Sequence, residues 1–193
     1  MQHILVEDSI YEFNLNIPIQ ELIDYTNLLE QSGEGQYTGE NRRSNYGGFQ
    51  SFEYPFIHHQ THLTPLLDEV FDLISSLIEK NLDTRYSYVL NNYWFNINFP
   101  GSYNRLHDHL TPYKHQQGLS GTFYLQVPLN SGNIVFVNEE KKKELEVQSS
   151  AGKVLLFPSY LLHKVTENLS SSDRYSVAFN YDMAVKPGNR SRI

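Results

Sequence analysis

Two segments near the start of the chain repeat their apolar residues at the spacing of one helical face. The first is residues 18–31, with Gly33 placed to end a helix; its apolar positions are Ile19, Leu22, Ile23 and Leu29. The second is residues 64–81, whose apolar positions are Leu66, Leu67, Val70, Phe71, Ile74, Leu77 and Ile78. Polar residues occupy the opposite face of the second helix. We therefore expect two N-terminal helices, the second lying on an apolar surface.

From residue 86 onward, apolar and polar residues alternate with the period of half-buried strands. Short turns rich in Gly, Pro, Asn and Ser separate these runs. Strands are expected near residues 86–99, 105–110, 119–127, 133–137, 144–148, 153–157, 161–166 and 174–182. Many short strands with small turns predict a mainly β (α+β) protein, a double-stranded β-helix or jelly roll with the N-terminal helices packed on one outer face.

The chain length of 193 residues fits one domain, residues 1–193. We expect a helical N-terminal part over residues 1–85, a jelly-roll core over residues 86–183 and a tail over residues 184–193. Within the first part, residues 33–51 are polar and rich in Gly, as in a long loop. This segment is a candidate lid over a substrate.

The composition excludes several classes of function. A formal net charge of -7 argues against nucleic acid as a partner, because phosphate contacts need a basic surface. The absence of Cys excludes disulfides, thiolate zinc sites, iron–sulfur clusters and a cysteine nucleophile, so a metal would bind His, Asp, Glu or water. The sequence shows neither a signal peptide nor an apolar run long enough to span a membrane, so a cytoplasmic protein is expected.

Three of the eight histidines form a candidate metal site. His107 and His109 stand two residues apart on an expected strand, so their side chains point to one face while Asp108 points away. His163 interrupts an apolar strand 54 positions later. Each of these alone is either a hydrogen-bonded core histidine or a metal ligand. The others, expected to have surface or lid roles without metal, are His3, His58, His59, His62 and His115.

Arg174 and Tyr124 favour the interpretation of the three histidines as metal ligands. Arg174 opens an apolar strand beside the one that carries His163, and a buried Arg requires an anionic partner. Tyr124, on the strand after the His pair, can donate its hydroxyl to the same anion. Two close ligands, a distant third and an Arg inside a jelly roll form the pattern of an iron site with a bound dicarboxylate.

The same segments resemble the Fe(II)/2-oxoglutarate-dependent oxygenases of the prolyl-4-hydroxylase-like group, and most closely an uncharacterised bacterial and phage branch of it. The branch has a His-x-His, distal His and Arg pattern. The resemblance covers roughly 140 residues, in the expected order. It is carried by residues 44–51 (SNYGGFQS), 93–109 (YWFNINFPGSYNRLHDH), 118–128 (GLSGTFYLQVP), 155–168 (LLFPSYLLHKVTEN) and 174–182 (RYSVAFNYD).

The resemblance implies roles for these residues. His107 and His163 match the first and distal ligands of Fe(II), and Arg174 and Tyr124 match the residues that hold the C5 carboxylate of 2-oxoglutarate. The family carries a carboxylate at the second ligand position, where this chain has His109. We expect His109 to be that ligand, with Asp108 as the alternative. Whether a three-His site is catalytically active stays open.

The resemblance implies an Fe(II)- and 2-oxoglutarate-dependent dioxygenase that uses O2 to hydroxylate an unactivated C–H bond of a peptide, an amino acid or a small metabolite. Trp94, Asn96 and Asn98 alternate onto one strand face and are candidate contacts to substrate or cosubstrate; otherwise they face solvent. Three alternatives remain: a three-His cupin-like dioxygenase that does not use 2-oxoglutarate, a non-catalytic jelly-roll binding module and a capsid-like structural protein. For the oxygenase we expect a monomer or homodimer.

Overall fold

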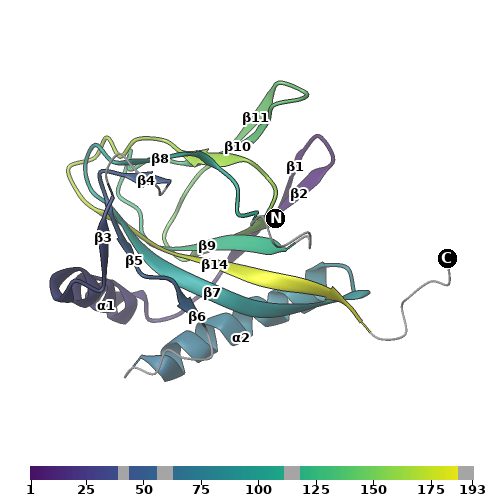
Figure 1. The fold of residues 1–193 in the computed structure, drawn as a ribbon, viewed down its shortest axis with the longest axis horizontal. Coiled ribbons are helices and arrows are strands. Elements are labelled where there is room, and N and C mark those ends of the chain that lie inside the picture. The colour runs from purple at the N-terminus through teal and green to yellow at the C-terminus, as the bar shows by residue number, and fades with distance from the viewer. Residues whose placement is uncertain (39–43, 56–62, 111–117, 187–193) are drawn as a thin grey trace.

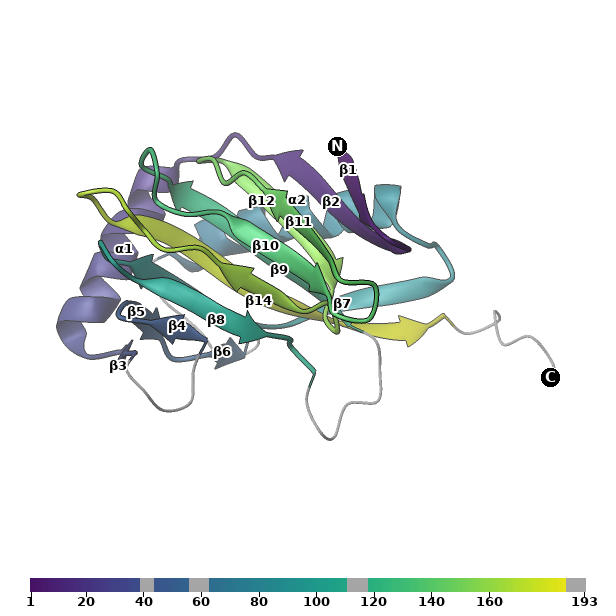
Figure 2. The same ribbon diagram turned by 90° about the horizontal axis from the view of Figure 1, so that it is seen from above.

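Two antiparallel β-sheets face each other, and two helices cover the outer side of the larger sheet (Figure 1). The computed structural model describes residues 1–38, 44–55, 63–110 and 118–186. Viewed from above, the smaller sheet lies over the larger one, with the helices beneath both (Figure 2). The prediction of a mainly β jelly roll with helices on one outer face is confirmed.

The larger sheet contains nine strands among the described residues. They follow the order β1 (Gln2–Leu5), β2 (Asp8–Asn14), β12 (Lys153–Pro158), β9 (Leu119–Gln126), β14 (Arg174–Val185), β7 (Tyr86–Asn98), β5 (Phe49–Ser51) and β3 (Gly35–Tyr37). The ninth strand, β6 (Tyr54–Pro55), pairs with β7 beside this path. The two long strands β7 and β14 pair with each other and form the middle of the sheet.

The smaller sheet contains five strands among the described residues. Their order is β11 (Lys143–Val147), β10 (Ile134–Asn138), β13 (His163–Val165), β8 (Tyr103–His107) and β4 (Asn45–Tyr46). Strands β8 and β13 are neighbours in this sheet although they are far apart in the sequence. The topology therefore places the His107 segment next to the His163 segment.

Alternate residues of the central strands point to opposite sides of the larger sheet. Phe95 on β7 and Val177 on β14 are buried in the apolar core that the helices cover. An adjacent residue on each strand, Asn96 after Phe95 and Ser176 before Val177, lines a cavity between the two sheets. Since side chains on a strand alternate between faces, one short run of sequence supplies both a hydrophobic core and a polar cavity wall.

The helices α1 (Ile19–Ser32) and α2 (Thr64–Asn81) follow the expected apolar spacing. Helix α1 ends at Gly33, whose positive φ of 74° is easily adopted only by a residue without a side chain. Helix α2 buries its apolar face against the larger sheet, and each such side chain contributes roughly 1.5–3 kcal/mol. The most buried of them are Leu67, Val70, Phe71, Ile74 and Ile78. Neither helix has a stretch apolar enough to cross a membrane, within the part of the chain that the structure describes.

The N-terminal part differs from the expectation of a purely helical segment. Residues 1–55 contain the six strands β1 to β6, and these complete both sheets. Segment 33–51, expected to be a loop, contains β3, β4 and β5, with residues 39–43 outside the described residues. These strands are two or three residues long, and they form by pairing, not by local alternation: β4 pairs with β8, β5 with β7 and β3 with β5. At the other end, β14 continues to Val185, past the expected core boundary.

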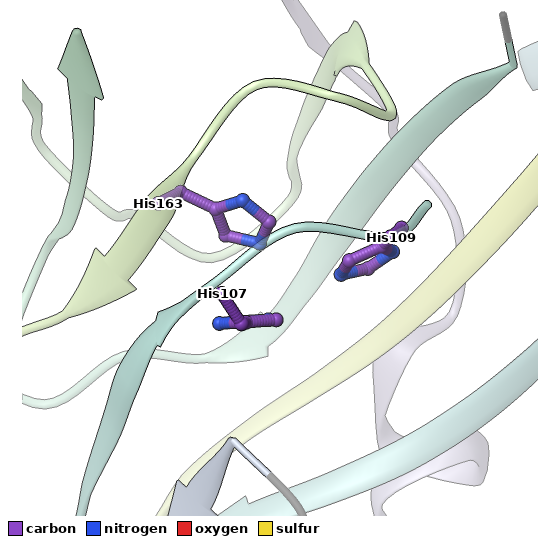
Figure 3. Close-up of side chains that lie close together, drawn as sticks. All are labelled: His107, His109 and His163. Atoms are coloured by element: carbon purple, nitrogen blue, oxygen red, sulfur yellow. The ribbon is translucent and has the colours of Figure 1, made fainter. Parts of the chain in front are cut away.

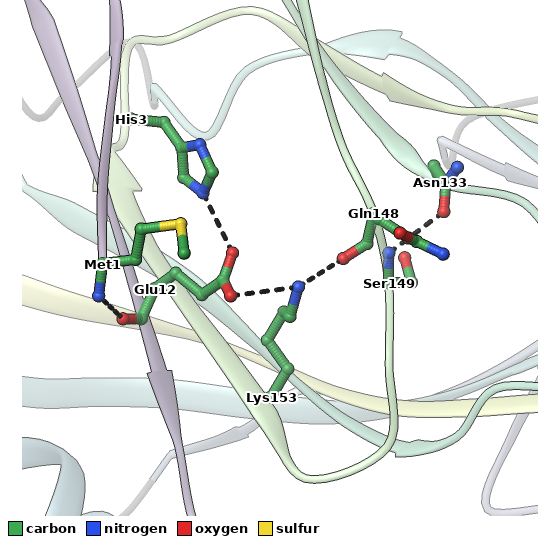
Figure 4. A network of polar contacts seen from close by, with 7 residues as sticks. All are labelled: Met1, His3, Glu12, Asn133, Gln148, Ser149 and Lys153. Carbon is green, nitrogen blue, oxygen red and sulfur yellow. Dashed lines mark hydrogen bonds and ion pairs between the residues drawn. The ribbon is translucent and has the colours of Figure 1, made fainter.

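An ion pair fastens the N-terminal hairpin to the jelly roll (Figure 4). The Lys153 ammonium on β12 lies 3.2 Å from the Glu12 carboxylate on β2, and it also donates to the backbone carbonyl of Gln148 at 2.6 Å. His3 on β1 lies 2.9 Å from the second oxygen of Glu12. Burial raises the pKa of the Glu12 carboxyl, but the hydrogen bonds from His3 and Lys153 outweigh this effect and leave the pKa below its usual value.

We predict that Glu12→Gln lowers the free energy of unfolding by about 3 kcal/mol at neutral pH, because it leaves the Lys153 ammonium buried without its counter-charge. The two side chains are only 14% and 10% exposed. Because the pKa of Glu12 is lowered on folding, its contribution is present above pH 4.5 and is lost as the pH falls through the folded value. Urea unfolding followed by circular dichroism measures the change.

The exposed pair Lys164–Glu144 provides the matched control. Glu144→Gln should change the free energy of unfolding by less than about 1 kcal/mol, because exposed ion pairs contribute little. An equal effect of the two substitutions would show that the Glu12–Lys153 pair stabilises the protein no more than an exposed ion pair does.

Candidate metal and anion site

A β-bulge directs His107 into the cavity between the sheets. Strand β13 pairs with β8 so that His163 lies opposite His107, whereas Val165 lies opposite Asn104. Between these two pairs β8 therefore contains one residue more than β13. Because of this extra residue, His107 points to the same side as Asn104 and not to the opposite side, as regular alternation would require. As a result, both Asn104 and His107 line the cavity. Bulges commonly re-aim side chains next to functional sites.

His109 lies two residues beyond the end of β8. Its backbone N–H donates to the carbonyl of Ser159 at 2.9 Å, which ties this segment to the chain after β12. The His109 ring points into the cavity, as His107 does. Asp108 between them is exposed, and its carboxylate accepts a hydrogen bond from the Leu110 N–H at 3.0 Å. The expected alternation therefore holds over residues 107–109, although the regular strand ends at His107.

The three imidazole rings point toward one another from β8, from the segment after it and from β13 (Figure 3). Ring centroids are separated by 4.2 Å for His107–His163, 5.0 Å for His109–His163 and 5.3 Å for His107–His109. One ring nitrogen from each side chain lies within 4.8 Å of those from the other two. A single metal ion between them would draw these atoms closer, since metal–nitrogen bonds are about 2.1 Å long.

The Nδ1 atom of each ring contacts a carbonyl oxygen. His107 Nδ1 lies 2.7 Å from the backbone oxygen of Arg105, and His163 Nδ1 lies 2.9 Å from that of Leu161. His109 Nδ1 lies 2.8 Å from the side-chain Oδ1 of Asn180. A carbonyl oxygen only accepts, so each Nδ1 carries the proton and each Nε2 keeps its lone pair. This is the tautomer in which Nε2 can bind a metal.

The surroundings keep these imidazoles neutral. Burial lowers the pKa of His107 to about 4, with a smaller contribution from His109. Burial also lowers the pKa of His109, and burial together with the other two rings places the pKa of His163 well below its usual value. Three neutral nitrogen donors facing one point fit a divalent transition metal such as Fe(II).

Arg174 lines the same cavity and is only 2% exposed. It begins β14, whereas His109 contacts Asn180 further along that strand, so Arg174 lies at the end of the cavity away from His109. Its Nη2 donates to Asn98 Oδ1 at 2.9 Å, and its Nη1 donates to the backbone oxygens of Ser131 and Gly132 at 3.3 and 3.2 Å. Its Nε has no hydrogen-bond partner in the described part of the chain. Burial lowers the pKa of the guanidinium. Because none of these contacts is a carboxylate, the buried charge fits an anionic ligand.

Tyr124 lines the same cavity as Arg174. Its side chain is 2% exposed, and burial raises the pKa of its phenol, an effect that the Arg174 charge partly offsets. The hydroxyls of Ser131 and Ser149 are buried without a partner among the described residues, and the backbone oxygen of Ser131 accepts a hydrogen bond from Arg174. The sequence did not indicate Ser131 and Ser149, because serines in turns carry no pattern that marks them as neighbours of Arg174 and Tyr124.

The three candidates on β7 all face the cavity. Trp94 lies with its ring 5.6 Å from that of His109, and Asn96 is buried beside Ser176. Asn98 contacts Arg174 and also donates to Asn104 Oδ1 at 3.0 Å. Their place inside the cavity is thus established, while direct contact with a substrate stays a prediction.

The remaining histidines lie elsewhere. His3 contacts Glu12 in the N-terminal hairpin. The other four, His58, His59, His62 and His115, lie outside the described residues. The surface or lid roles expected for them stay predictions.

Comparison with known proteins agrees with the geometry of the site. Residues 137–180, which include His163 and Arg174, match the family model described as "Putative 2OG-Fe(II) oxygenase". A search of curated proteins found no match.

Solved structures of several oxygenases share the fold of the chain. A prolyl-4-hydroxylase of Pseudomonas putida is 17% identical, with a TM-score of 0.65 over 91% of this chain and 92% of that one. The viral collagen prolyl hydroxylase of Paramecium Bursaria Chlorella virus-1, in a 2OG complex, is 13% identical, with a TM-score of 0.58 over 92% and 96%. The epimerase SnoN, with Fe3+, alpha ketoglutarate and nogalamycin RO bound, is 14% identical, with a TM-score of 0.71 over 94% and 83%. The chain thus resembles 2-oxoglutarate and iron oxygenases in its fold and in part of its sequence.

We predict that His109→Ala abolishes binding of Co(II), used as an air-stable substitute for Fe(II), whereas Asp108→Ala leaves the affinity within a factor of about three. His109 faces the other two imidazoles, but Asp108 is exposed and contacts its own loop. Titration calorimetry with the purified variants measures both affinities. Loss of binding in Asp108→Ala alone would make the carboxylate the second ligand.

We also predict that the metal-free protein loses stability as the pH falls from about 6.5 to about 4. Imidazoles of the unfolded chain take up protons in this range, whereas burial lowers the pKa of His107 to about 4 and keeps the folded imidazoles neutral. The unfolded state binds more protons than the folded state, so the free energy of unfolding decreases as the pH falls. His107→Gln should make this dependence shallower in urea unfolding with a chelator present; an unchanged slope would refute the burial argument.

Proposed function

We propose that this protein is an oxygenase that uses Fe(II), 2-oxoglutarate and O2 to hydroxylate an unactivated C–H bond. The observation that carries the proposal is the arrangement of one cavity. Three neutral imidazoles face one point at one end, and a buried Arg that has no carboxylate partner among the described residues lies at the other end. A dicarboxylate that also binds a metal suits both ends at once.

Different residues of the cavity would bind the metal and the cosubstrate. His107, His109 and His163 would hold Fe(II) through Nε2, and Arg174 with Tyr124 would hold the C5 carboxylate of 2-oxoglutarate. A guanidinium suits this task because it can donate two parallel hydrogen bonds to a carboxylate. The metal and cosubstrate, when bound, supply the oxidising chemistry, in which 2-oxoglutarate and O2 are converted to succinate and CO2 as a C–H bond is hydroxylated.

The protein contributes position and a dry environment. Phe157 and Ile134, both buried, line the cavity and limit the access of water, and the Phe157 ring lies 4.8 Å from that of His163. Trp94, Asn96 and Asn98 are the candidate contacts to the substrate or the cosubstrate, because all three line the cavity. The exclusion of water strengthens the interaction of Arg174 with a carboxylate.

The substrate is proposed only by class, as a peptide, an amino acid or a small metabolite. Two of the similar structures are prolyl hydroxylases, whereas SnoN is an epimerase bound to nogalamycin RO, so the shared fold does not narrow this choice. Ser44 in segment 33–51 lines the cavity, but β3, β4 and β5 of this segment are paired within the sheets, so the lid expected there stays a prediction. A cytoplasmic location, a bacterial or phage origin, a monomer or homodimer and the absence of nucleic-acid partners stay predictions from the sequence.

We predict that anaerobic addition of Fe(II) and 2-oxoglutarate to the protein produces a visible charge-transfer absorption band. Arg174→Met should weaken 2-oxoglutarate binding by about a hundredfold, because it removes the buried cation, while Co(II) still binds. His163→Ala should lose both the metal and the band. Absorption titrations measure the band, and succinate formation on admission of air measures turnover.

Lys164→Met, next to His163 on β13 but exposed and paired with Glu144, provides the control and should change neither property. Metal binding that is indifferent to 2-oxoglutarate would contradict the proposal and favour the three-His cupin-like dioxygenase. Failure of the wild-type protein to bind any divalent metal would favour a non-catalytic jelly-roll module.

A further inference from the structure

His109 differs from the other two imidazoles in what orients it. His107 and His163 each contact the backbone oxygen two residues earlier in their own segment, so the local chain path holds their Nδ1 protons. His109 instead contacts the side chain of Asn180, which lies on β14 in the opposite sheet. The orientation of His109 therefore depends on which way the Asn180 amide is turned.

A chain of hydrogen bonds continues from Asn180 to the surface. The Nδ2 of Asn180 donates to Asn92 Oδ1 at 2.9 Å, and the Nδ2 of Asn92 donates to the Glu53 carboxylate at 3.2 Å. Asn92 and Asn180 are directly opposite each other on β7 and β14. Glu53 lies just before β6, which pairs with β7 at Asn92.

The carboxylate fixes the direction of this chain. A carboxylate only accepts, so Asn92 must turn its NH2 group toward Glu53 and its Oδ1 toward Asn180. Asn180 must then turn its NH2 group toward Asn92 and its Oδ1 toward His109. Turning either amide over would place two acceptors against each other and lose a hydrogen bond, the exposed one to Glu53 or the half-buried one between the two amides.

Ser120 supports the same orientation from β9. Its hydroxyl lies 2.7 Å from Asn180 Oδ1 and 2.9 Å from the hydroxyl of Ser159. Ser120 can thus donate to Asn180 and accept from Ser159. Asn180 Oδ1 then receives two hydrogen bonds, from Ser120 and from His109 Nδ1, and both of its lone pairs are used.

We propose that Asn180, oriented by Asn92 and Glu53, is the positioning residue that keeps the proton of His109 on Nδ1 and directs its Nε2 lone pair to the metal. A carboxylate in the place of His109 would need no such device, because both of its oxygens can bind a metal whichever way it turns. The inference rests on the proposed metal-binding role of His109.

The test compares three substitutions in the full chain. Asn180→Leu removes the acceptor, Asn92→Leu removes the partner that orients it, and Asn180→Asp keeps an acceptor for the Nδ1 proton. Two-dimensional NMR of the metal-free protein with 15N-labelled histidine reports which ring nitrogen carries the proton. Calorimetry with Co(II) reports the affinity.

In the wild type and in Asn180→Asp, His109 should carry its proton on Nδ1. In Asn180→Leu it should populate both tautomers, and the Co(II) affinity should fall between ten- and a hundredfold, the usual range for loss of a residue that orients a metal ligand. Asn92→Leu should show a smaller effect of the same kind. The spectra of His107 and His163 should not change, because backbone carbonyls orient those rings.

Asn91→Leu is the matched control, since Asn91 adjoins Asn92 but its amide donates to the exposed carboxylate of Asp182. It should leave both the His109 tautomer and the Co(II) affinity unchanged. An unaltered tautomer in Asn180→Leu, or a loss of affinity that Asn180→Asp does not restore, would overturn the inference. A wild-type tautomer as expected, with no metal binding at all, would instead refute the proposed function.

Discussion

The two-residue period of the central strands is the constraint on which this molecule depends. On β7 and β14, odd-numbered positions such as Phe95 and Val177 bury apolar side chains under the helices. Even-numbered positions such as Asn96, Asn98 and Arg174 line the cavity. A shift of register by one residue would bring the charge and the amides into the hydrophobic core and the aromatic rings into the cavity. The same packing that stabilises the fold therefore holds the polar face in position.

Bulges modify this period where the site requires it. Strict alternation from Asn104 would turn His107 away from the cavity, and the extra residue in β8 corrects this. A second irregularity follows Asn180 on β14, where Tyr181 pairs with Leu90 and Asn91 is left over. Asn91 and Asn92 consequently donate hydrogen bonds to different carboxylates, those of Asp182 and Glu53 respectively. In both places the departure from regular pairing lies next to a residue of the proposed metal centre.

The sequence predicted the fold well where periodicity was long and clear. Both helices and the strands from residue 86 onward occur close to their expected positions. The strands β3 to β6 did not emerge from the sequence, because segments of two or three residues have no readable period and depend on pairing with β5, β7 or β8. The same reason explains why a loop was expected over residues 33–51.

The candidate site was predictable to a similar extent. The spacing of His107 and His109 and the isolation of His163 and Arg174 within apolar strands are visible in the sequence, and the structure places all four around one cavity. Ser131, Ser149 and Asn180 could not be found in this way. Their importance comes from which strand neighbours which, and a turn serine or a strand asparagine has the same local sequence signature at any position on the surface.

The charges of the cavity distinguish this arrangement from one with a carboxylate ligand. Three neutral imidazoles with a divalent metal and the Arg174 guanidinium carry three positive charges, against two negative charges on 2-oxoglutarate. A carboxylate in place of His109 would remove one of those positive charges. The excess charge attracts the anionic cosubstrate, but it also disfavours protonation of any imidazole in the group, because like charges at this separation repel strongly in a buried site. Neutral imidazoles are therefore required by the cavity as well as by the metal, and the fixed Nδ1 partners let each ring stay neutral while its Nε2 lone pair faces the proposed metal position.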